Sequence, residues 1–215
     1  MRLRNIPGAD EKVAQSPFCI NDAKIHLGTW HKYLGNDHPI HLEIGMGKGR
    51  FLMELALKNP EIEYIGVERY TSVLLRAVQK LEENPLSNLH FICEDAATLP
   101  EIFAEEEISR IYLNFSDPWP KDRHSKRRLT SHVFLERYAK FLAKDGQLEF
   151  KTDNQDLFTF SLEEIGNSPA WRLTAATRDL HHDTALCQGN VMTEYEEKFS
   201  ALGNPICKLI AVRQP

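Results

Sequence analysis

Glycines and carboxylates follow the short hydrophobic segments of this sequence, and residues of these types can hold a polar ligand. The first segment runs into EIGMGKGRF, in which Gly45, Gly47 and Gly49 are spaced by two. Glycine lets the backbone turn sharply and pass close to a ligand, and a helix that follows offers unpaired N–H groups at its start. The third glycine comes one residue too early for the dinucleotide-binding pattern G-x-G-x-x-G. The loop therefore indicates either another kind of ligand-binding turn or a plain tight turn.

A carboxylate follows each of the next four hydrophobic segments. Glu68 comes after the second, where an acid can accept hydrogen bonds from both hydroxyls of a ribose; alone, it could equally be a solvated surface residue. Asp95 comes after the third and could accept from an adenine amino group or cap a short helix. Asp117 and Asp153 follow the fourth and fifth. A Gly turn or an acid after five successive segments exceeds what chance would give, and it indicates one shared site.

The segment around Asp117 reads SDPWPKDRHSKRR. Pro118 should hold Asp117 in an extended conformation, and Pro120 should do the same for Trp119. The segment is therefore expected to be stiff and to aim both side chains. Trp119 would then either stack on a base or sit at the edge of the core. The basic run that follows is more often a solvated face when it stands alone.

Short segments rich in β-branched and aromatic residues alternate with amphipathic ones along the chain. The expected strands are 40–44, 62–67, 89–92, 110–115, 147–151, 171–177 and 206–212. The expected helices are 21–34, 49–58, 71–83, 130–143 and 154–165. This alternation predicts an α/β fold with right-handed βαβ units and an open, mostly parallel sheet with helices on both faces. Ligands of such sheets bind at the carboxyl ends of the strands.

The bulk properties favour one globular domain over residues 21–215, preceded by a flexible basic arm over residues 1–20 that carries Arg2 and Arg4. No apolar stretch approaches the roughly 20 residues of a membrane helix, and the start of the chain lacks the apolar region of a secretory signal. Four cysteines, none in a C-x-x-C motif, indicate reduced thiols in a cytoplasmic protein. The net charge of −5 argues against a surface that binds nucleic acid throughout, but it leaves room for a basic patch.

The E-x-G-x-G-x-G loop with the acids after the second and third strands resembles the cofactor site of class I S-adenosylmethionine methyltransferases. SDPWPKDRHSKRR, FKTDN and TEYE together resemble the bacterial tRNA (guanine-N7)-methyltransferases, from about residue 20 to the C-terminus. The resemblance implies a Rossmann-like sheet of seven strands and S-adenosylmethionine as the methyl donor, with S-adenosylhomocysteine as product. It implies tRNA as the partner and guanosine 46 of the variable loop as the target.

The resemblance also implies roles for particular residues. The residues expected to line the cofactor site are Glu43, Gly45, Gly47, Gly49, Glu68, Asp95 and Asp117. The residues expected to meet the target guanosine are Lys121, Asp153, Thr193, Glu194, Tyr195 and Glu196. The residues expected to touch RNA are Arg123, His124, Ser125, Lys126, Arg127 and Arg128. Asp117 is the expected catalytic residue, beside the cofactor and the reacting nitrogen.

The chemistry of this reaction needs few special groups. Guanine N7 bears a lone pair and no proton, so no general base is required, and positioning should supply most of the catalysis. A carboxylate that accepts from guanine N1–H and the exocyclic amine would select guanine over adenine, and Asp153 or Glu196 is the candidate. Thr193 and Glu196 also read as a capping box for a helix over 194–202. His181 and His182 are expected in a surface loop without a metal.

Three other functions share part of the pattern. A nicotinamide-dependent oxidoreductase would share the Gly turn and Glu68, but the glycine spacing and the lack of a Tyr-x-x-x-Lys pair disfavour it. A small-molecule methyltransferase would have no use for the basic run. A non-catalytic RNA-binding protein would need no acids at five strand ends. The sequence leaves open whether the protein is a monomer or a homodimer.

Overall fold

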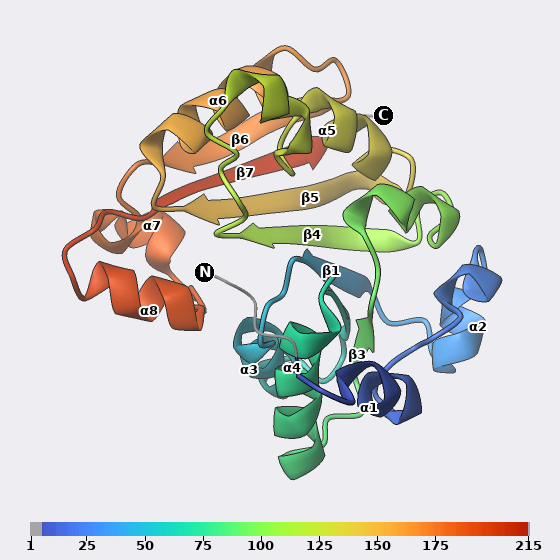
Figure 1. Ribbon diagram of the computed structural model, residues 1–215. Coiled ribbons are helices and arrows are strands. Elements are labelled where there is room, and N and C mark those ends of the chain that lie inside the picture. The colour runs from blue at the N-terminus through green and yellow to red at the C-terminus, as the bar shows by residue number, and fades with distance from the viewer. Residues whose placement is uncertain (1–5, 215) are drawn as a thin grey trace. The chain divides into compact units, whose positions relative to one another are not determined.

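The computed structural model describes residues 6–214, and the chain divides into two compact units between Ala104 and Glu105. The units are described separately below, so a single domain over 21–215 stays a prediction. Arg2 and Arg4 lie outside the described residues. The described part of the expected arm contains an α-helix, α1 (Ala9–Gln15), which packs beside α4 (Thr71–Glu83) of the same unit (Figure 1).

Unit 1 is built around three parallel strands in the order β3-β2-β1. Four α-helices and two short 3₁₀ helices complete the described part of this unit. The unit comprises α1, η1 (Ala23–His26), α2 (Trp30–Leu34), β1 (Ile40–Ile44), α3 (Arg50–Lys58), β2 (Glu63–Val67), α4, β3 (Leu89–Ile92) and η2 (Ala96–Glu101). β1 and β2 are buried along their whole length, as expected for parallel strands covered on both faces.

Helix α4 shows why these sequences fold as they do. Its buried side chains recur at helical spacing and form one apolar face: Leu74, Leu75, Ala77, Val78 and Leu81. Helix α3 packs against β2 and β3. Between them Met46 folds over Gly66, so closely that a Cβ at Gly66 would lie 2.1 Å from the Met46 sulfur. The glycine in β2 is therefore a packing requirement.

Unit 2 is built around four strands in the order β4-β5-β7-β6. β4 and β5 are parallel, whereas β7 runs antiparallel to both β5 and β6. The unit comprises β4 (Ile108–Asn114), η3 (Asp122–Arg127), α5 (His132–Tyr138), β5 (Leu142–Thr152), α6 (Gln155–Gly166), β6 (Trp171–Thr177), η4 (Leu180–His182), α7 (Thr184–Cys187), α8 (Glu194–Ser200) and β7 (Cys207–Arg213). Helices α7 and α8 lie beyond the carboxyl end of β5 (Figure 1).

Two predicted helices are wrong in extent. The helix expected over 21–34 is two short pieces, η1 and α2, because the chain turns at Gly28 with a φ of 73°. The helix expected over 130–143 covers only α5. Thr130, which would begin this helix, instead forms a buried hydroxyl pair with Ser161 on α6 at 2.7 Å. Leu142, expected in the helix, begins β5 and pairs with Ile108 of β4.

The strand expected over 147–151 is longer, because β5 begins at Leu142, and the other predicted elements agree with the structure to within two residues at their ends. The bounds of β1, β3, β6 and α4 match the prediction. In the part of the chain that the structure describes, no helix is long and apolar enough to cross a membrane.

Candidate functional site

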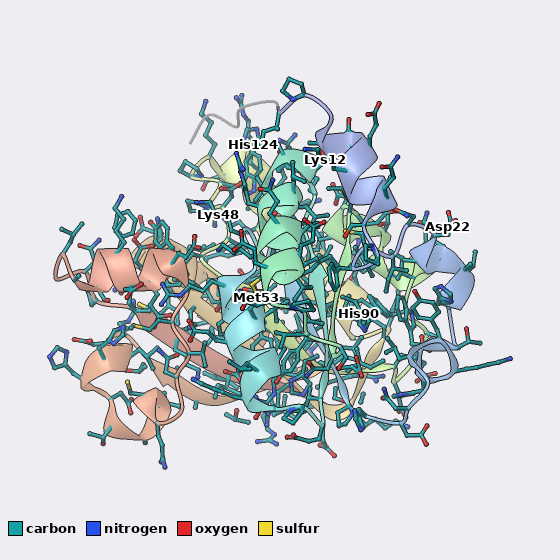
Figure 2. The ribbon with its side chains drawn as sticks, turned by 90° about the horizontal axis from the view of Figure 1, so that it is seen from below. Lys12, Asp22, Lys48, Met53, His90 and His124 are labelled. Carbon is teal, nitrogen blue, oxygen red and sulfur yellow. The ribbon has the colours of Figure 1, made fainter. Side chains whose placement is uncertain are left out.

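The glycine turn of unit 1 follows β1 and leads into α3. Gly45, Gly47 and Gly49 have φ values of 78°, 59° and 76°, which lie in the left-handed region that favours glycine. The N–H groups of Gly45 and Met46 both donate to the carbonyl of Val67, at 2.8 and 3.1 Å. The turn is thus tied to the end of β2. Lys48, in the turn, and Met53, on α3, are labelled in Figure 2.

The three glycines do different things. A Cβ at Gly45 or Gly47 would meet nothing within 4 Å, so these residues leave open space above the turn. A Cβ at Gly49 would lie 3.0 Å from the Ala77 Cβ, so Gly49 lets α3 pack against α4. Gly45 and Gly47 are therefore the two that can admit a ligand.

Glu68 is held by the backbone at the end of β2. Its Oε2 accepts from the Gly47 N–H at 3.1 Å and its Oε1 from the Tyr70 N–H at 3.0 Å. Two backbone donors stabilise the ionised carboxylate and fix its direction. Glu68 and the glycine turn, which the sequence predicted to share a site, are brought together in this way.

Asp95 follows β3, as expected, and Glu43 is the last residue but one of β1. Asp95 caps η2, because its Oδ1 accepts from the Ala97 N–H at 2.9 Å, while its Oδ2 lies 3.2 Å from Arg69. The capping role that the sequence left open is therefore present. Glu43 lies within β1 and is 2% exposed. Burial, followed by the negative charges of Glu68 and Glu94, raises the pKa of the Cys93 thiol beside this cluster.

In unit 2, the chain bends sharply on both sides of Asp117. Phe115 and Trp119 have φ values of 52° and 41°, which residues other than glycine rarely adopt. The prediction that Pro120 keeps Trp119 extended is wrong. Tertiary contacts hold Trp119 instead, because the Arg128 guanidinium donates to the carbonyls of Pro118 and Trp119 at 3.0 and 3.2 Å. Asp117 itself is exposed.

The basic run forms the 3₁₀ helix η3 and its flanks. Lys121, Arg123, Lys126 and Arg127 are exposed, and His124 and Ser125 are half-buried. Arg127 stacks on the Trp119 ring, with 5.0 Å between the guanidinium carbon and the ring centroid. Four exposed cations on one short segment can contact phosphates.

Asp153 lies just past β5 beside a group of aromatic rings. The Tyr195 hydroxyl donates to Asp153 Oδ2 at 3.1 Å. The Tyr195 ring stacks on Phe199 at a centroid distance of 4.1 Å and lies 4.8 Å from Phe115. Partial burial raises the pKa of Tyr195, and the charge of Asp153 and the hydrogen bond to it raise it further. The phenol therefore stays protonated and donates to Asp153 at neutral pH.

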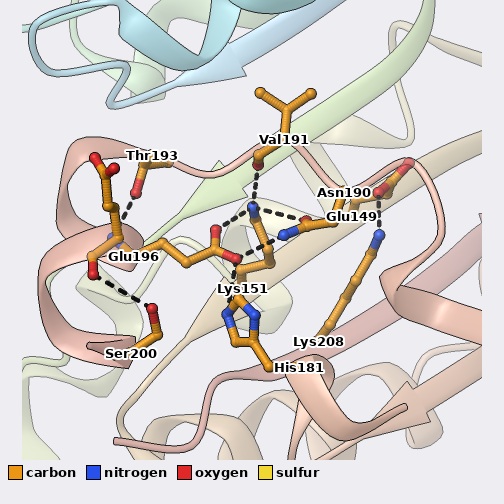
Figure 3. A network of polar contacts seen from close by, with 10 residues as sticks. Glu149, Lys151, His181, Asn190, Val191, Thr193, Glu196, Ser200 and Lys208 are labelled. Atoms are coloured by element: carbon orange, nitrogen blue, oxygen red, sulfur yellow. Dashed lines mark hydrogen bonds and ion pairs between the residues drawn. The ribbon is translucent and has the colours of Figure 1, made fainter. Parts of the chain in front are cut away.

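Glu196, one residue further on, turns away from the surface into a buried network (Figure 3). Its side chain is fully buried, with Oε2 2.5 Å from the Lys151 ammonium and Oε1 2.7 Å from the Asn190 amide. Lys151 is 5% exposed in its side chain and also donates to the Val191 carbonyl at 2.9 Å. His181 Nε2 lies 3.4 Å from Glu196 Oε1. The network ties α8 to β5.

Half of the predicted capping box is present. Thr193 caps α8, because its hydroxyl accepts from the Glu196 N–H at 3.0 Å. The Glu196 side chain, which would complete the box, is bound to Lys151 instead. Glu194 is half-buried at the start of α8, and Lys121 precedes η3.

The two histidines differ. His182 is largely exposed and contacts Asp179, as expected of a surface loop, whereas His181 faces the buried Glu196. Within residues 6–214, no three His, Cys, Asp or Glu side chains form a group that could hold a metal ion.

The sequence missed three residues that shape this part of unit 2. Lys151 stands in FKTDN directly before the predicted site, and its position in a buried strand was a signal that it needs a charged partner. Phe115 ends the RIYLNF segment, and nothing local shows that it meets Tyr195. For Arg128 only the role was missed: an RNA contact was predicted, and no local pattern indicates that its guanidinium binds two carbonyls.

An α/β fold with a glycine turn after its first strand and acids after the following strands is typical of the class I methyltransferases. Solved structures agree. The chain resembles the 16S rRNA methyltransferase KamB with a TM-score of 0.64 at 14% identity, over 87% of this chain and 94% of that one. It resembles a 16S rRNA (adenine(1408)-N(1))-methyltransferase with cosubstrate SAM from Catenulisporales acidiphilia with a TM-score of 0.57 at 15% identity, over 87% and 91%. The predicted Rossmann-like fold is confirmed.

Sequence comparison gives the family. Residues 37–209 match the family described as "Putative methyltransferase". The tRNA (guanine-N(7)-)-methyltransferase of Lachnoclostridium phytofermentans is 58% identical over 214 residues, which cover 100% of this chain and 99% of the relative. The chain belongs to the tRNA (guanine-N(7)-)-methyltransferase family, as the sequence motifs indicated.

Unit 1 fits S-adenosylmethionine, the methyl donor of this class. The turn leaves open space at Gly45 and Gly47, and the Glu68 carboxylate is fixed beside it by the Gly47 and Tyr70 N–H groups. Carboxylates suit a ligand that carries a sulfonium and an ammonium group.

Proposed function

We propose that this protein transfers a methyl group from S-adenosylmethionine to N7 of guanosine 46 in the tRNA variable loop. The observation that carries the acceptor side is the arrangement around Asp153: a carboxylate aligned by the Tyr195 hydroxyl, beside aromatic rings, in the same unit as the cations of η3. Membership of the tRNA (guanine-N(7)-)-methyltransferase family indicates guanine as the target base and N7 as the atom that accepts the methyl group. The setting we propose is the cytoplasm, where bacterial tRNA resides.

The donor is held by unit 1 in this proposal. Gly45 and Gly47 let the backbone pass beside it, and Glu68 accepts hydrogen bonds from the ribose hydroxyls while its direction is set by two backbone N–H groups. Glu43 stands toward the methionine end and Asp95 toward the adenine. When bound, the donor supplies a methyl carbon activated by its positive sulfur.

The acceptor base is held by unit 2. Asp153 accepts from guanine N1–H and the exocyclic amine, which adenine cannot offer, and Tyr195 holds the carboxylate for that contact. Glu196 is buried and bound to Lys151, so of the two acids that the sequence put forward, Asp153 is the better candidate for the base. Thr193 and Glu194, at the start of α8, complete the side of the site that meets the guanosine. Lys121 and the exposed residues of 123–127 contact phosphates of the tRNA.

The transfer balances without a general base. The N7 lone pair forms the new bond to the methyl carbon as the carbon–sulfur bond breaks, and the bonding electrons return to sulfur. The guanine ring gains the positive charge, which the Asp153 carboxylate stabilises from the opposite edge. Asp117 stays the candidate for the group beside the reacting nitrogen.

Methyl transfer from labelled S-adenosylmethionine to two unmodified tRNA transcripts tests the proposal. One transcript carries guanosine at position 46 and the control carries adenosine. We expect label on the first only, at guanine N7. Bound donor with no label on either transcript would overturn the tRNA assignment and favour a small-molecule methyltransferase. Binding of tRNA without binding of the donor would favour a non-catalytic RNA-binding protein.

Sedimentation of the purified protein would decide between the monomer and the homodimer that the proposal leaves open.

A further inference from the structure

We propose that Arg128 is a positioning residue, which holds the segment 115–119 in its bent form so that Asp117 and Trp119 face the substrate. This inference rests on the proposed function and assigns to Arg128 a task other than the RNA contact that its place in the basic run predicts.

The contacts of Arg128 differ from those of its basic neighbours. Its Nε donates to the Pro118 carbonyl and its NH2 group to the Trp119 carbonyl, so the guanidinium closes on two successive peptide units. Its flat face lies over the Phe160 ring of α6, with 4.3 Å between the guanidinium carbon and the ring centroid. Arg128 is half-buried, whereas Arg123 and Lys126 are exposed.

The segment that Arg128 holds needs such support. Phe115 and Trp119 both have positive φ, and a non-glycine residue in that region persists only where its surroundings enforce it. Pro118 and Pro120 lack N–H groups, so this stretch can donate few backbone hydrogen bonds of its own. Phe115 is held at the other end of the segment, where its N–H donates to the Lys151 carbonyl. The two carbonyls that Arg128 binds lie between Asp117 and Pro120, so Arg128 links the second half of the bend to the core of unit 2.

The arginine is itself anchored on both sides. Its N–H donates to the Ser125 carbonyl and its carbonyl accepts from the Ser131 N–H, both at 3.0 Å. Thr130, two residues later, is buried against Ser161 of α6. Arg128 therefore joins the bend to α6, a helix of the same unit. Its planar guanidinium donates two hydrogen bonds in a fixed geometry, which the ammonium group of a lysine cannot reproduce.

Arg128→Lys is the test, because it keeps the positive charge and removes the planar guanidinium that binds the two carbonyls. We expect kcat to fall on the order of 100-fold, as for a small misplacement of reacting groups, while the salt dependence of the tRNA KM stays native. Arg123→Gln is the comparison. It removes an exposed cation, so it should raise the tRNA KM and reduce the salt slope by about one phosphate contact.

A second measurement does not depend on activity. Of the three tryptophans, Trp30 and Trp171 are buried, at 0% and 4% exposure, so acrylamide quenching of fluorescence reports mainly on Trp119. We expect Arg128→Lys to increase quenching and Arg123→Gln to leave it native. Both variants are compared below their unfolding temperatures.

Each result decides the matter. A raised KM and a lower salt slope for Arg128→Lys, with native kcat and quenching, would make Arg128 a phosphate contact and overturn the proposal. Native kinetics and quenching together would also overturn it. If the native enzyme methylates no tRNA, the proposed function fails. Increased quenching in Arg128→Lys would still establish that Arg128 holds the segment 115–119.

Discussion

The two units bend the chain at their strand ends by different means. In unit 1, the turn after β1 passes through three glycines with positive φ, and backbone N–H groups tie it to Val67 and Glu68. In unit 2, the bend after β4 passes through Phe115 and Trp119, also with positive φ. The Phe115 N–H donates to the Lys151 carbonyl of β5, and beyond Asp117 the Arg128 side chain binds the carbonyls of Pro118 and Trp119. Glycine makes the positive φ values of unit 1 possible without strain, whereas in unit 2 residues with side chains adopt them and depend on contacts such as those of Arg128.

The difference has an energetic consequence. Left-handed φ costs a residue with a Cβ about 1–2 kcal/mol, whereas glycine adopts it freely. The turn of unit 1 therefore carries no such cost, but the bend of unit 2 needs contacts that offset it. Helix α8 shows the same dependence, because the Lys151–Glu196 pair attaches it to β5. Substitutions away from the substrate should thus disturb the site in unit 2 more than the site in unit 1.

The largest effect is expected where a buried pair is broken. Lys151→Met leaves the fully buried Glu196 carboxylate without its cation, and loss of one partner of such a pair costs about 3–5 kcal/mol. The free energy of unfolding, from urea titration, measures this. Adding Glu196→Leu removes the uncompensated charge, so the double variant should recover most of the loss.

An exposed pair in unit 1 provides the control. Lys24 and Glu101 are paired at 2.5 Å, but their side chains are 49% and 62% exposed. Water screens such a pair, so Lys24→Met should unfold at the native urea midpoint. Equal midpoints for Lys151→Met and Lys24→Met would refute the view that a buried pair holds unit 2 together.

An intermediate effect is expected in the glycine turn. Gly47 and Gly35 have φ values of 59° and 76°, and a Cβ at either would meet nothing within 4 Å. Alanine at either position should therefore cost about 1–2 kcal/mol of stability through backbone strain alone.

Only Gly47 lies in the turn at which we propose that the donor binds, so donor binding separates the two variants. Gly47→Ala adds a methyl group above the turn and strains the N–H that fixes Glu68. We expect S-adenosylmethionine to bind on the order of tenfold more weakly, which corresponds to 1.4 kcal/mol, with Gly35→Ala binding as the native protein does. Calorimetric titration would show it, and equal affinities would place the donor elsewhere.

The sequence predicted what local pattern determines. The bounds of α4 follow from apolar periodicity, and the glycine turn follows from residue type, because only glycine adopts those φ values freely. The acid that the backbone fixes, Glu68, was likewise predicted together with that turn.

The contacts that the sequence could not give are those between distant positions. Lys151 meets Glu196 across 45 positions, and Tyr195 meets Asp153 across 42. Residue types showed that these were candidate site residues, but not which of them is buried and which faces outward. The prediction that Trp119 is extended was wrong for the same reason. The preference set by Pro120 is local, and the contacts of Arg128 outweigh it.

The smallest effect is expected at the Asp153–Tyr195 pair, where the comparison can be sharpened to a single hydrogen bond. Partial burial and the Asp153 carboxylate raise the pKa of Tyr195. Asp153→Asn removes the charge, so ionisation of the phenol becomes easier and its pKa should fall toward the ordinary value. Titration of carbon-13-labelled tyrosine by NMR would resolve this residue among the six tyrosines.

Tyr138 is the internal control. It lies in the same unit and is fully buried, and burial raises its pKa without a carboxylate beside it, so it should not respond to Asp153→Asn. A shift confined to Tyr195 would establish that a side-chain contact, rather than the backbone, aligns the acceptor carboxylate. An unshifted Tyr195 would mean that the phenol does not align Asp153 in solution. The acceptor side would then owe its geometry to the end of β5 alone, as the donor side owes its geometry to the turn after β1.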